Sequence, residues 1–174
     1  GVPRAPSADA NSTLAHWDGA CSTTAASETT CTVDVQADLA LGATFDVRQV
    51  TLDVGVTGLG RVTSTSPASL TIDCTGGATG CSQTVAAGTS ITLHATPNTD
   101  YVFRGWTLPS CTGTGDCTFT IVDDTHVEAQ FTDGRTSVGV SVDGGDGSGI
   151  VVSDVGGIDC GSTCSALYVP GTHV

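Results

Sequence analysis

The chain has 174 residues and combines 5 Lys and Arg with 18 Asp and Glu, so its formal net charge at pH 7 is −13. This charge repels nucleic-acid phosphates and anionic membrane surfaces, which proteins approach with clustered Lys and Arg, so we expect neither as a partner. Hydrophobic residues form 39% of the chain, enough for a small core, and no apolar run approaches the ~18 residues of a membrane-spanning helix.

Alternation of apolar and polar residues with a period of two predicts β-strands along much of the chain. The predicted strands cover residues 50–56, 90–95, 117–122, 126–131 and 138–142. Turn-forming residues separate them, at residues 58–60, 97–100, 123–124 and 143–149. No long stretch has the period of an amphipathic helix, so we predict an all-β fold of short, mostly antiparallel strands.

The sequence contains an internal repeat. Residues 17–45 begin with Trp, contain two Cys and end with Phe, and residues 106–131 have the same order and the same spacing from second Cys to Phe. Residues 72–91 begin with Ile-Asp-Cys, contain a second Cys and then Gly-Thr, and residues 158–174 repeat this pattern. Such self-similarity indicates a repeat architecture.

The order of the matching segments divides the chain into three parts. Residues 1–46 hold the C-terminal half of a repeat, residues 47–134 a complete repeat, and residues 135–174 the N-terminal half of a repeat. For the complete repeat we expect about eight short strands in two layers. We therefore predict tandem, disulfide-stapled β-sandwich repeats with a half-repeat at each end.

A half-repeat of ~40 residues rarely supplies a sufficient core, and an open sheet edge accepts a strand from another chain. Either the chain is part of a longer array, or the C-terminal half of one copy completes the N-terminal half of the next by strand complementation. Both alternatives predict a linear object, and in the second alternative copies of the chain join head to tail. In the second alternative, the inter-subunit junction contains Gly1, Val2, Pro6, Thr172 and Val174.

Several short motifs occur in a defined order along the chain. They are Ile72-Asp-Cys74, Ala87-Gly-Thr89, Ala95-Thr-Pro97, Tyr101-Val-Phe-Arg-Gly-Trp106, the Cys111/Cys117 pair and Val127-Glu-Ala-Gln-Phe131. Together these motifs resemble the divergent InlB B-repeat family of bacterial surface proteins. The resemblance implies small β-grasp-like modules along secreted or surface-anchored proteins, with a spacer, stalk or adhesin role and no catalysis.

The eight cysteines form four close pairs along the sequence. These pairs are Cys21/Cys31, Cys74/Cys81, Cys111/Cys117 and Cys160/Cys164. An even number of regularly spaced cysteines in a small chain indicates an oxidising, extracellular compartment, and each local disulfide would contribute roughly 2–3 kcal/mol. The alternatives are pairing between segments of one repeat, or a zinc site, for which only Cys160/Cys164 has suitable spacing.

Trp17 and Trp106 occupy the same position of the repeat. They are candidate sugar-stacking platforms. Because they are the only Trp residues of a chain poor in aromatics, we predict instead that they are core anchors. Asp143 and Asp146, in the Gly-rich loop 143–149, are candidate Ca²⁺ ligands. That loop lacks the remaining acidic ligands of an EF-hand, so we expect no cofactor.

The four histidines are the other candidates for chemistry, because the chain is rich in Ser and Asp. His16, His94, His126 and His173 do not recur at equivalent positions of the repeat, and no nucleophile elbow or metalloprotease motif is present. We therefore predict a secreted, non-enzymatic structural protein of an extracellular filament, fibre or cell-surface stalk. The alternative is an adhesin or a module that binds a surface glycan or host protein, for which the loop 143–149 is the best candidate.

Overall fold

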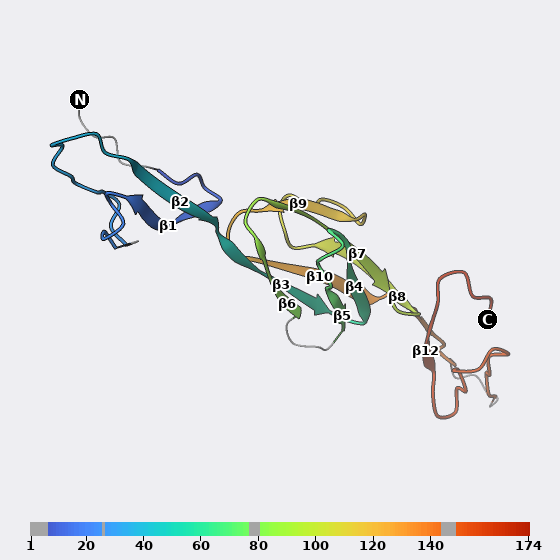
Figure 1. Cartoon of the computed structure of the whole chain (residues 1–174). Helices are drawn as coiled ribbons and strands as arrows, with labels where there is room; N and C mark the ends of the chain where they lie inside the picture. The colour runs from blue at the N-terminus through green and yellow to red at the C-terminus, as the bar shows by residue number, and fades with distance from the viewer. Residues whose placement is uncertain (1–6, 26, 77–80, 144–148) are drawn as a thin grey trace.

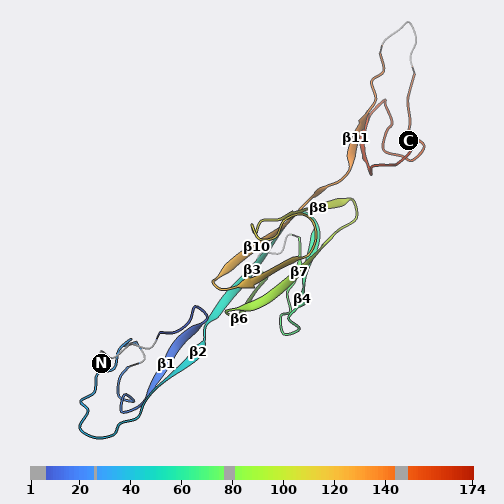
Figure 2. The same cartoon turned by 90° about the horizontal axis from the view of Figure 1, so that it is seen from above.

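The computed structural model describes residues 7–25, 27–76, 81–143 and 149–174. Its strands form three parts in a row along an elongated molecule, with the two termini at opposite ends (Figures 1 and 2). We call them the N-terminal unit (residues 7–47), the central sandwich (residues 49–133) and the C-terminal unit (residues 136–174). Among the described residues, no helix has the length and apolarity needed to cross a bilayer.

The central sandwich consists of two four-stranded sheets, with strand orders β6-β3-β10-β8 and β5-β4-β7-β9. Its strands are β3 (Gln49–Thr57), β4 (Gly60–Ser66), β5 (Asp73–Thr75), β6 (Cys81–Ala86), β7 (Thr89–Pro97), β8 (Tyr101–Trp106), β9 (Cys117–Ile121) and β10 (Thr125–Asp133). All neighbouring strands are antiparallel except β3 and β10, which are parallel. The predicted all-β, mostly antiparallel fold is confirmed.

Each end unit has one two-stranded antiparallel sheet. The strands are β1 (Ser12–Gly19) and β2 (Leu41–Val47) in the N-terminal unit, and β11 (Thr136–Gly139) and β12 (Ser165–Tyr168) in the C-terminal unit. The strand predicted at residues 138–142 is wrong in its bounds. β11 ends at Gly139 because its partner β12 begins at Ser165, and only the Val140 backbone N–H continues the ladder, donating to the Cys164 carbonyl at 2.8 Å.

The hydrophobic core lies between the two sheets of the central sandwich. Alternate residues of β3, β7 and β10 point into it, including the fully buried Leu52, Leu93 and Val127. Outside this core, the buried hydrophobic residues among those described are Trp17, Cys21, Ile158 and Cys160. The two end units therefore contribute little core of their own, and disulfides account for half of these four residues.

An aromatic ring closes the core beside the turn that connects β3 to β4, where the chain passes from one sheet to the other. Phe131 is 3% exposed, and its ring centroid lies 5.1 Å from that of Phe103. The Phe131 ring also covers Gly60, where an added Cβ atom would lie 2.5 Å from the ring. Glycine is therefore the only residue type that fits at position 60 without displacement of the Phe131 ring.

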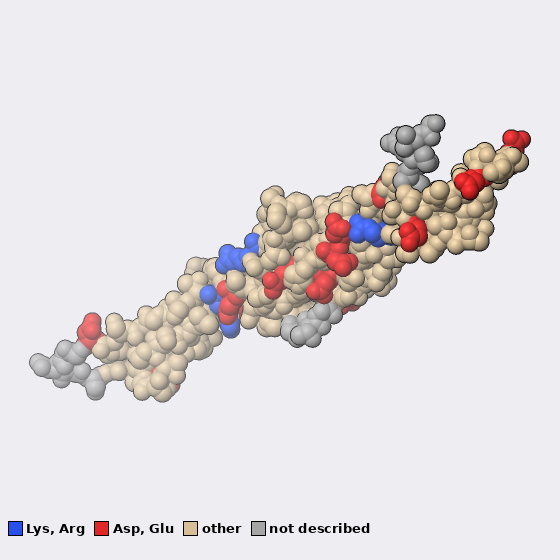
Figure 3. Space-filling model, turned by 90° about the vertical axis from the view of Figure 1, so that its left-hand side faces the viewer, with Lys and Arg blue, Asp and Glu red and all other residues tan. Residues whose placement is uncertain are grey.

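Acidic side chains are spread over the face shown in Figure 3, and the Arg side chains on that face lie near them. Three Arg residues form ion pairs: Arg48 with Asp123 at 3.0 Å, Arg61 with Asp73 at 2.6 Å and Arg135 with Asp133 at 2.7 Å. These pairs are largely solvent-exposed, so each contributes little to stability.

The Asp133–Arg135 pair predicts a specific titration. Hydrogen bonds from the Arg135 side chain and then its backbone N–H lower the pKa of Asp133 to about 2. Because the folded-state pKa is below the ordinary value of ~3.9, this pair favours folding above pH ~4, and the contribution is lost as the pH falls toward about 2. We expect the Asp133 carboxyl carbon, followed by NMR, to titrate near 2 and to move toward ~3.9 in Arg135→Gln. Identical titrations in the two proteins would contradict this assignment.

Candidate functional site

A shallow, open depression is lined by Thr51, Asp53, Asp124, Thr125 and His126. His126 Nδ1 lies 2.7 Å from Asp53 Oδ2, but both side chains are exposed and no hydroxyl nucleophile is hydrogen-bonded to this histidine. A catalytic histidine would need a nucleophile within hydrogen-bonding distance.

The candidate calcium ligands do not form a site in the described part of the chain. Asp146 lies outside the described residues, and Asp143 is exposed. Residues 7–25, 27–76, 81–143 and 149–174 contain no group of three or more His, Cys, Asp or Glu side chains placed to hold a metal ion. The candidate functional features are therefore surfaces rather than a pocket.

The four disulfides join the four close pairs of cysteines. They are Cys21–Cys31, Cys74–Cys81, Cys111–Cys117 and Cys160–Cys164, and no cysteine is free. Two of the disulfide loops are also tied to a tryptophan. The Trp17 indole N–H donates to the Glu28 carbonyl at 3.0 Å, and the Trp106 indole N–H donates to the Gly115 carbonyl at 2.8 Å.

The two tryptophans differ in burial. Trp17 is buried, whereas Trp106 is partly buried against the core and contacts Phe103 edge to face, with ring centroids 5.2 Å apart. Each indole therefore packs its apolar body inward and uses its N–H to hold the adjacent disulfide loop. This hydrogen bond was not predictable from the sequence, because its acceptor is a backbone carbonyl within an irregular loop.

The N-terminal unit has the strand pairing of one half of the central sandwich. When Trp17 is set against Trp106, the β1–β2 ladder has the same register as the β8–β10 ladder, and the one-residue irregularity occurs at the same place. The equivalent pairs are Trp17↔Ala43 with Trp106↔Ala129, and Leu14↔Phe45 with Phe103↔Phe131. Strand register determines which side chains lie on each face of a sheet. The shared register therefore indicates that β1–β2 and β8–β10 have equivalent apolar faces.

The C-terminal unit has the pairing of the other half. Its β11–β12 ladder has the register of β3–β6, with Val138↔Ala166 equivalent to Leu52↔Gln83. A pair of serine hydrogen bonds recurs as well. Ser64 Oγ donates to the Leu70 carbonyl at 2.6 Å and accepts from the Ile72 N–H at 3.0 Å. In the C-terminal unit, Ser153 Oγ donates to the Gly156 carbonyl at 2.8 Å and accepts from the Ile158 N–H at 3.1 Å.

Equivalent positions differ sharply in exposure. Phe45 is 37% exposed where Phe131 is 3% exposed, and Leu41 is 56% exposed where Val127 is fully buried. In the C-terminal unit, Val151 is 42% exposed where Val62 is fully buried. Each end unit thus presents an apolar face that, in the central sandwich, is covered by the complementary half.

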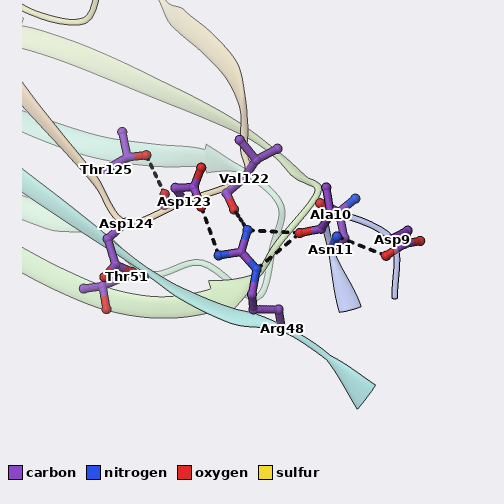
Figure 4. Close-up of polar contacts among 9 residues, drawn as sticks. All are labelled: Asp9, Ala10, Asn11, Arg48, Thr51, Val122, Asp123, Asp124 and Thr125. Carbon is purple, nitrogen blue, oxygen red and sulfur yellow. Dashed lines mark hydrogen bonds and ion pairs between the residues drawn. The ribbon is translucent and has the colours of Figure 1, made fainter. Parts of the chain in front are cut away.

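A single arginine connects the N-terminal unit to the central sandwich, between β2 and β3 (Figure 4). Arg48 Nη2 and Nε donate to the Ala10 carbonyl at 3.0 and 3.2 Å, and Nη1 donates to Asp123 Oδ1 at 3.0 Å. The Val122 carbonyl also accepts from Nη2. No local sequence signal marks Arg48, because its partners come from two separate segments, at residue 10 and at residues 122–123.

The backbone hydrogen bond at this connection recurs at the next one. The Arg48 N–H donates to the Asn11 carbonyl at 2.8 Å, and the Gly134 N–H donates to the Asp100 carbonyl at 2.7 Å between β10 and β11. The β2–β3 and β10–β11 connections therefore share an equivalent backbone hydrogen bond. Only the β2–β3 connection is also held by an arginine side chain, that of Arg48.

The predicted junction residues lie at the two ends of the chain. Gly1, Val2 and Pro6 are outside the described residues, whereas Thr172 and Val174 are exposed at the end of the C-terminal unit. The Thr172 hydroxyl donates to the Val169 carbonyl at 2.7 Å. The role of these residues in a junction stays a prediction.

Residues 67–135 match a known domain family, described as the divergent InlB B-repeat domain. The matched segment begins directly after β4 and ends two residues after β10, so it contains strands β5 to β10 of the central sandwich. No catalytic family matches, and neither a curated protein nor a solved structure matches the chain. A disulfide-rich domain of this family indicates an extracellular bacterial protein.

Proposed function

Because residues 67–135 of this chain are a divergent InlB B-repeat domain, a type typical of bacterial surface proteins, we propose that the chain is a non-enzymatic structural protein of the cell surface. It forms an extracellular filament, fibre or stalk in which copies join head to tail. The observation that carries this proposal is the recurrence of the two halves of the central sandwich, with their strand registers, in the two end units.

The end units are complementary halves of one further sandwich. The N-terminal unit supplies the β8–β10 half and the C-terminal unit supplies the β3–β6 half, which supports our division into half-repeats 1–46 and 135–174 around a complete repeat 47–134. The two units lie at opposite ends of the elongated chain (Figure 2), so one chain cannot bring them together. Two chains arranged head to tail can, and such an open contact propagates into a fibre.

The exposed apolar faces supply the driving force for this association. Burial of apolar surface stabilises a contact by about 25 cal/mol per Å², and strand pairing adds backbone hydrogen bonds at the open edges of β2 and β11. The disulfides hold each small half in shape before it is completed, so less conformational entropy is lost on assembly. The acidic surface keeps such a polymer soluble.

The test combines electron micrographs of the purified chain with its mass under non-reducing, denaturing conditions. We expect fibres that dissociate to a species near 17.3 kDa. Leu41→Asp places a charge on the exposed face of β2 and is expected to abolish the fibres without changing the thermal unfolding of the central sandwich. Val102→Asp, at an exposed apolar position of β8, is the matched control and leaves the fibres intact.

A monodisperse small particle with no fibres at any concentration would contradict the proposal and favour an adhesin or binding module. Equal loss of fibres in Leu41→Asp and Val102→Asp would contradict the assignment of the β2 face as the contact. Loss confined to Leu41→Asp supports both the structural role and the end units as its site.

A further inference from the structure

We propose that Gly149 is the docking position for the Phe45 ring of a second copy of this chain, and that the contact fixes a parallel pairing of β2 with β11. This inference rests on the proposed function and specifies the contact through which copies join. It concerns one apolar side chain and one glycine, at opposite ends of the molecule.

The central sandwich contains the completed form of this contact. The Phe131 ring covers Gly60, and an added Cβ atom at Gly60 would lie within 2.5–2.6 Å of three ring atoms. Real Cβ atoms do not approach other atoms so closely, so a side chain at this position displaces the ring. The ring is buried only because residue 60 has no side chain.

Gly149 is the equivalent of Gly60 in the C-terminal unit. The Cys160 N–H donates to the Val151 carbonyl at 2.8 Å, which repeats the pairing of Val62 with Cys74. Gly149 precedes Val151 by the same two positions as Gly60 precedes Val62. Ser153 likewise repeats the hydrogen bonds of Ser64, so the equivalence rests on contacts on the C-terminal side of the glycine.

Both halves of this contact are accessible in the single chain. No described atom outside the neighbouring residues lies within 4 Å of the Cβ position of Gly149, and this glycine is exposed. Phe45, the equivalent of Phe131, is exposed on β2. The ring and the glycine that would receive it are therefore both exposed, in units that lie at opposite ends of the chain (Figure 1).

The parallel β3–β10 pair defines how the strands meet. Val54 lies opposite Val127 in that pair, and both are buried. The equivalents are Val140, directly after β11, and Leu41 in β2. Pairing Val140 of one copy with Leu41 of the other gives a sheet of order β12-β11-β2-β1, which corresponds to β6-β3-β10-β8. An alternative dimer in which β2 of one copy pairs with β2 of the other would not bring Phe45 to Gly149.

The decisive experiment compares Gly149→Ala with Gly139→Ala. Among the described residues, nothing beyond the chain neighbours lies within 4 Å of the Cβ position of either glycine, so neither change is expected to alter thermal unfolding of the chain. The equivalent of Gly139 is Asp53, so the completed sheet accepts a side chain there. At Gly149 the added methyl meets the incoming Phe45 ring, and we expect at least about ten-fold weaker association by analytical ultracentrifugation and no fibres in micrographs.

Mixing provides a second readout. Gly149→Ala blocks only one end of the chain, so a small fraction of it added to the parent protein is expected to cap fibres and shorten them. Gly139→Ala is expected to assemble like the parent and to leave fibre length unchanged. Equal assembly of Gly149→Ala and Gly139→Ala would overturn this inference while leaving fibres, and hence the proposed function, intact.

The register is tested by cross-linking. Leu41→Cys/Val140→Cys is expected to give a ladder of disulfide-linked multimers whose cross-linked peptides join residue 41 to residue 140. Leu41→Cys/Ser141→Cys, which moves one thiol to the other face of the strand, is the matched control and remains unlinked. Fibres that cross-link equally in both variants would overturn the register, and absence of fibres from the parent chain would overturn the proposed function itself.

Discussion

Replacing Phe131 with alanine is expected to lower the free energy of unfolding of the central sandwich by about 3–5 kcal/mol. The Phe131 ring is 3% exposed, contacts the Phe103 ring and covers Gly60, so its removal leaves a cavity that the rigid sheets do not fill. The measurement is urea unfolding followed by circular dichroism, in the Gly149→Ala background that we expect to be monomeric.

Phe45→Ala is the matched control for this prediction, because Phe45 and Phe131 occupy equivalent positions. Phe45 is 37% exposed in the single chain, so its truncation is expected to cost about 1 kcal/mol or less of monomer stability. Under assembling conditions the order reverses, and Phe45→Ala removes the ring that docks on Gly149. Equal losses of monomer stability at the two positions would contradict the difference in burial.

Removing the Cys21–Cys31 disulfide is expected to unfold the N-terminal unit while the central sandwich stays folded. The described buried hydrophobic residues of this unit are Trp17 and Cys21, so little apolar packing remains when the loop is opened. Closing a loop of this length contributes about 3 kcal/mol in the chain-entropy account. This contribution exceeds the stability that one buried indole and a two-stranded sheet supply.

The measurement is amide hydrogen exchange by mass spectrometry on Cys21→Ala/Cys31→Ala. We expect loss of protection in β1 and β2 and unchanged protection in β3 and β10. The matched control is Cys111→Ala/Cys117→Ala, which opens the equivalent loop of the central sandwich. That variant is expected to lose about 2–3 kcal/mol of global stability but to stay folded, because its core is far larger. Protected β1 and β2 amides in the first variant would contradict the prediction.

Much of the secondary structure follows from local pattern. The period-two alternation at residues 50–56, 90–95 and 126–131 lies within β3, β7 and β10, because alternate side chains of a strand necessarily face opposite sides of its sheet. Of the predicted turns at 58–60 and 123–124, residues 58–59 and 123–124 lie between strands, and Gly60 begins β4. The strands predicted at 138–142 and 117–122 run past the ends of β11 and β9, because an alternating pattern can continue past the end of the partner strand.

The surfaces of the candidate site were harder to foresee. Sequence similarity aligned Phe45 with Phe131, but the exposure of one and the burial of the other depend on which strands cover them. The contacts of Arg48 with Ala10, Val122 and Asp123 join segments that are far apart in sequence. No local signal marks such a residue, because its partners are brought together only by the completed fold.

The sequence by itself determined the all-β class, the internal repeat and the cysteine pairs, since periodicity, self-similarity and spacing are properties of the chain that need no knowledge of neighbours. Only the tertiary structure decided that β3 and β10 run parallel, that Phe131 covers Gly60 and that the end units expose the faces the central sandwich buries. The physical reason is that alternation specifies which side chains of a strand point inward but not which distant strand pairs with it. That choice depends on the packing of the whole sandwich, where a ring and a glycine from different sheets meet.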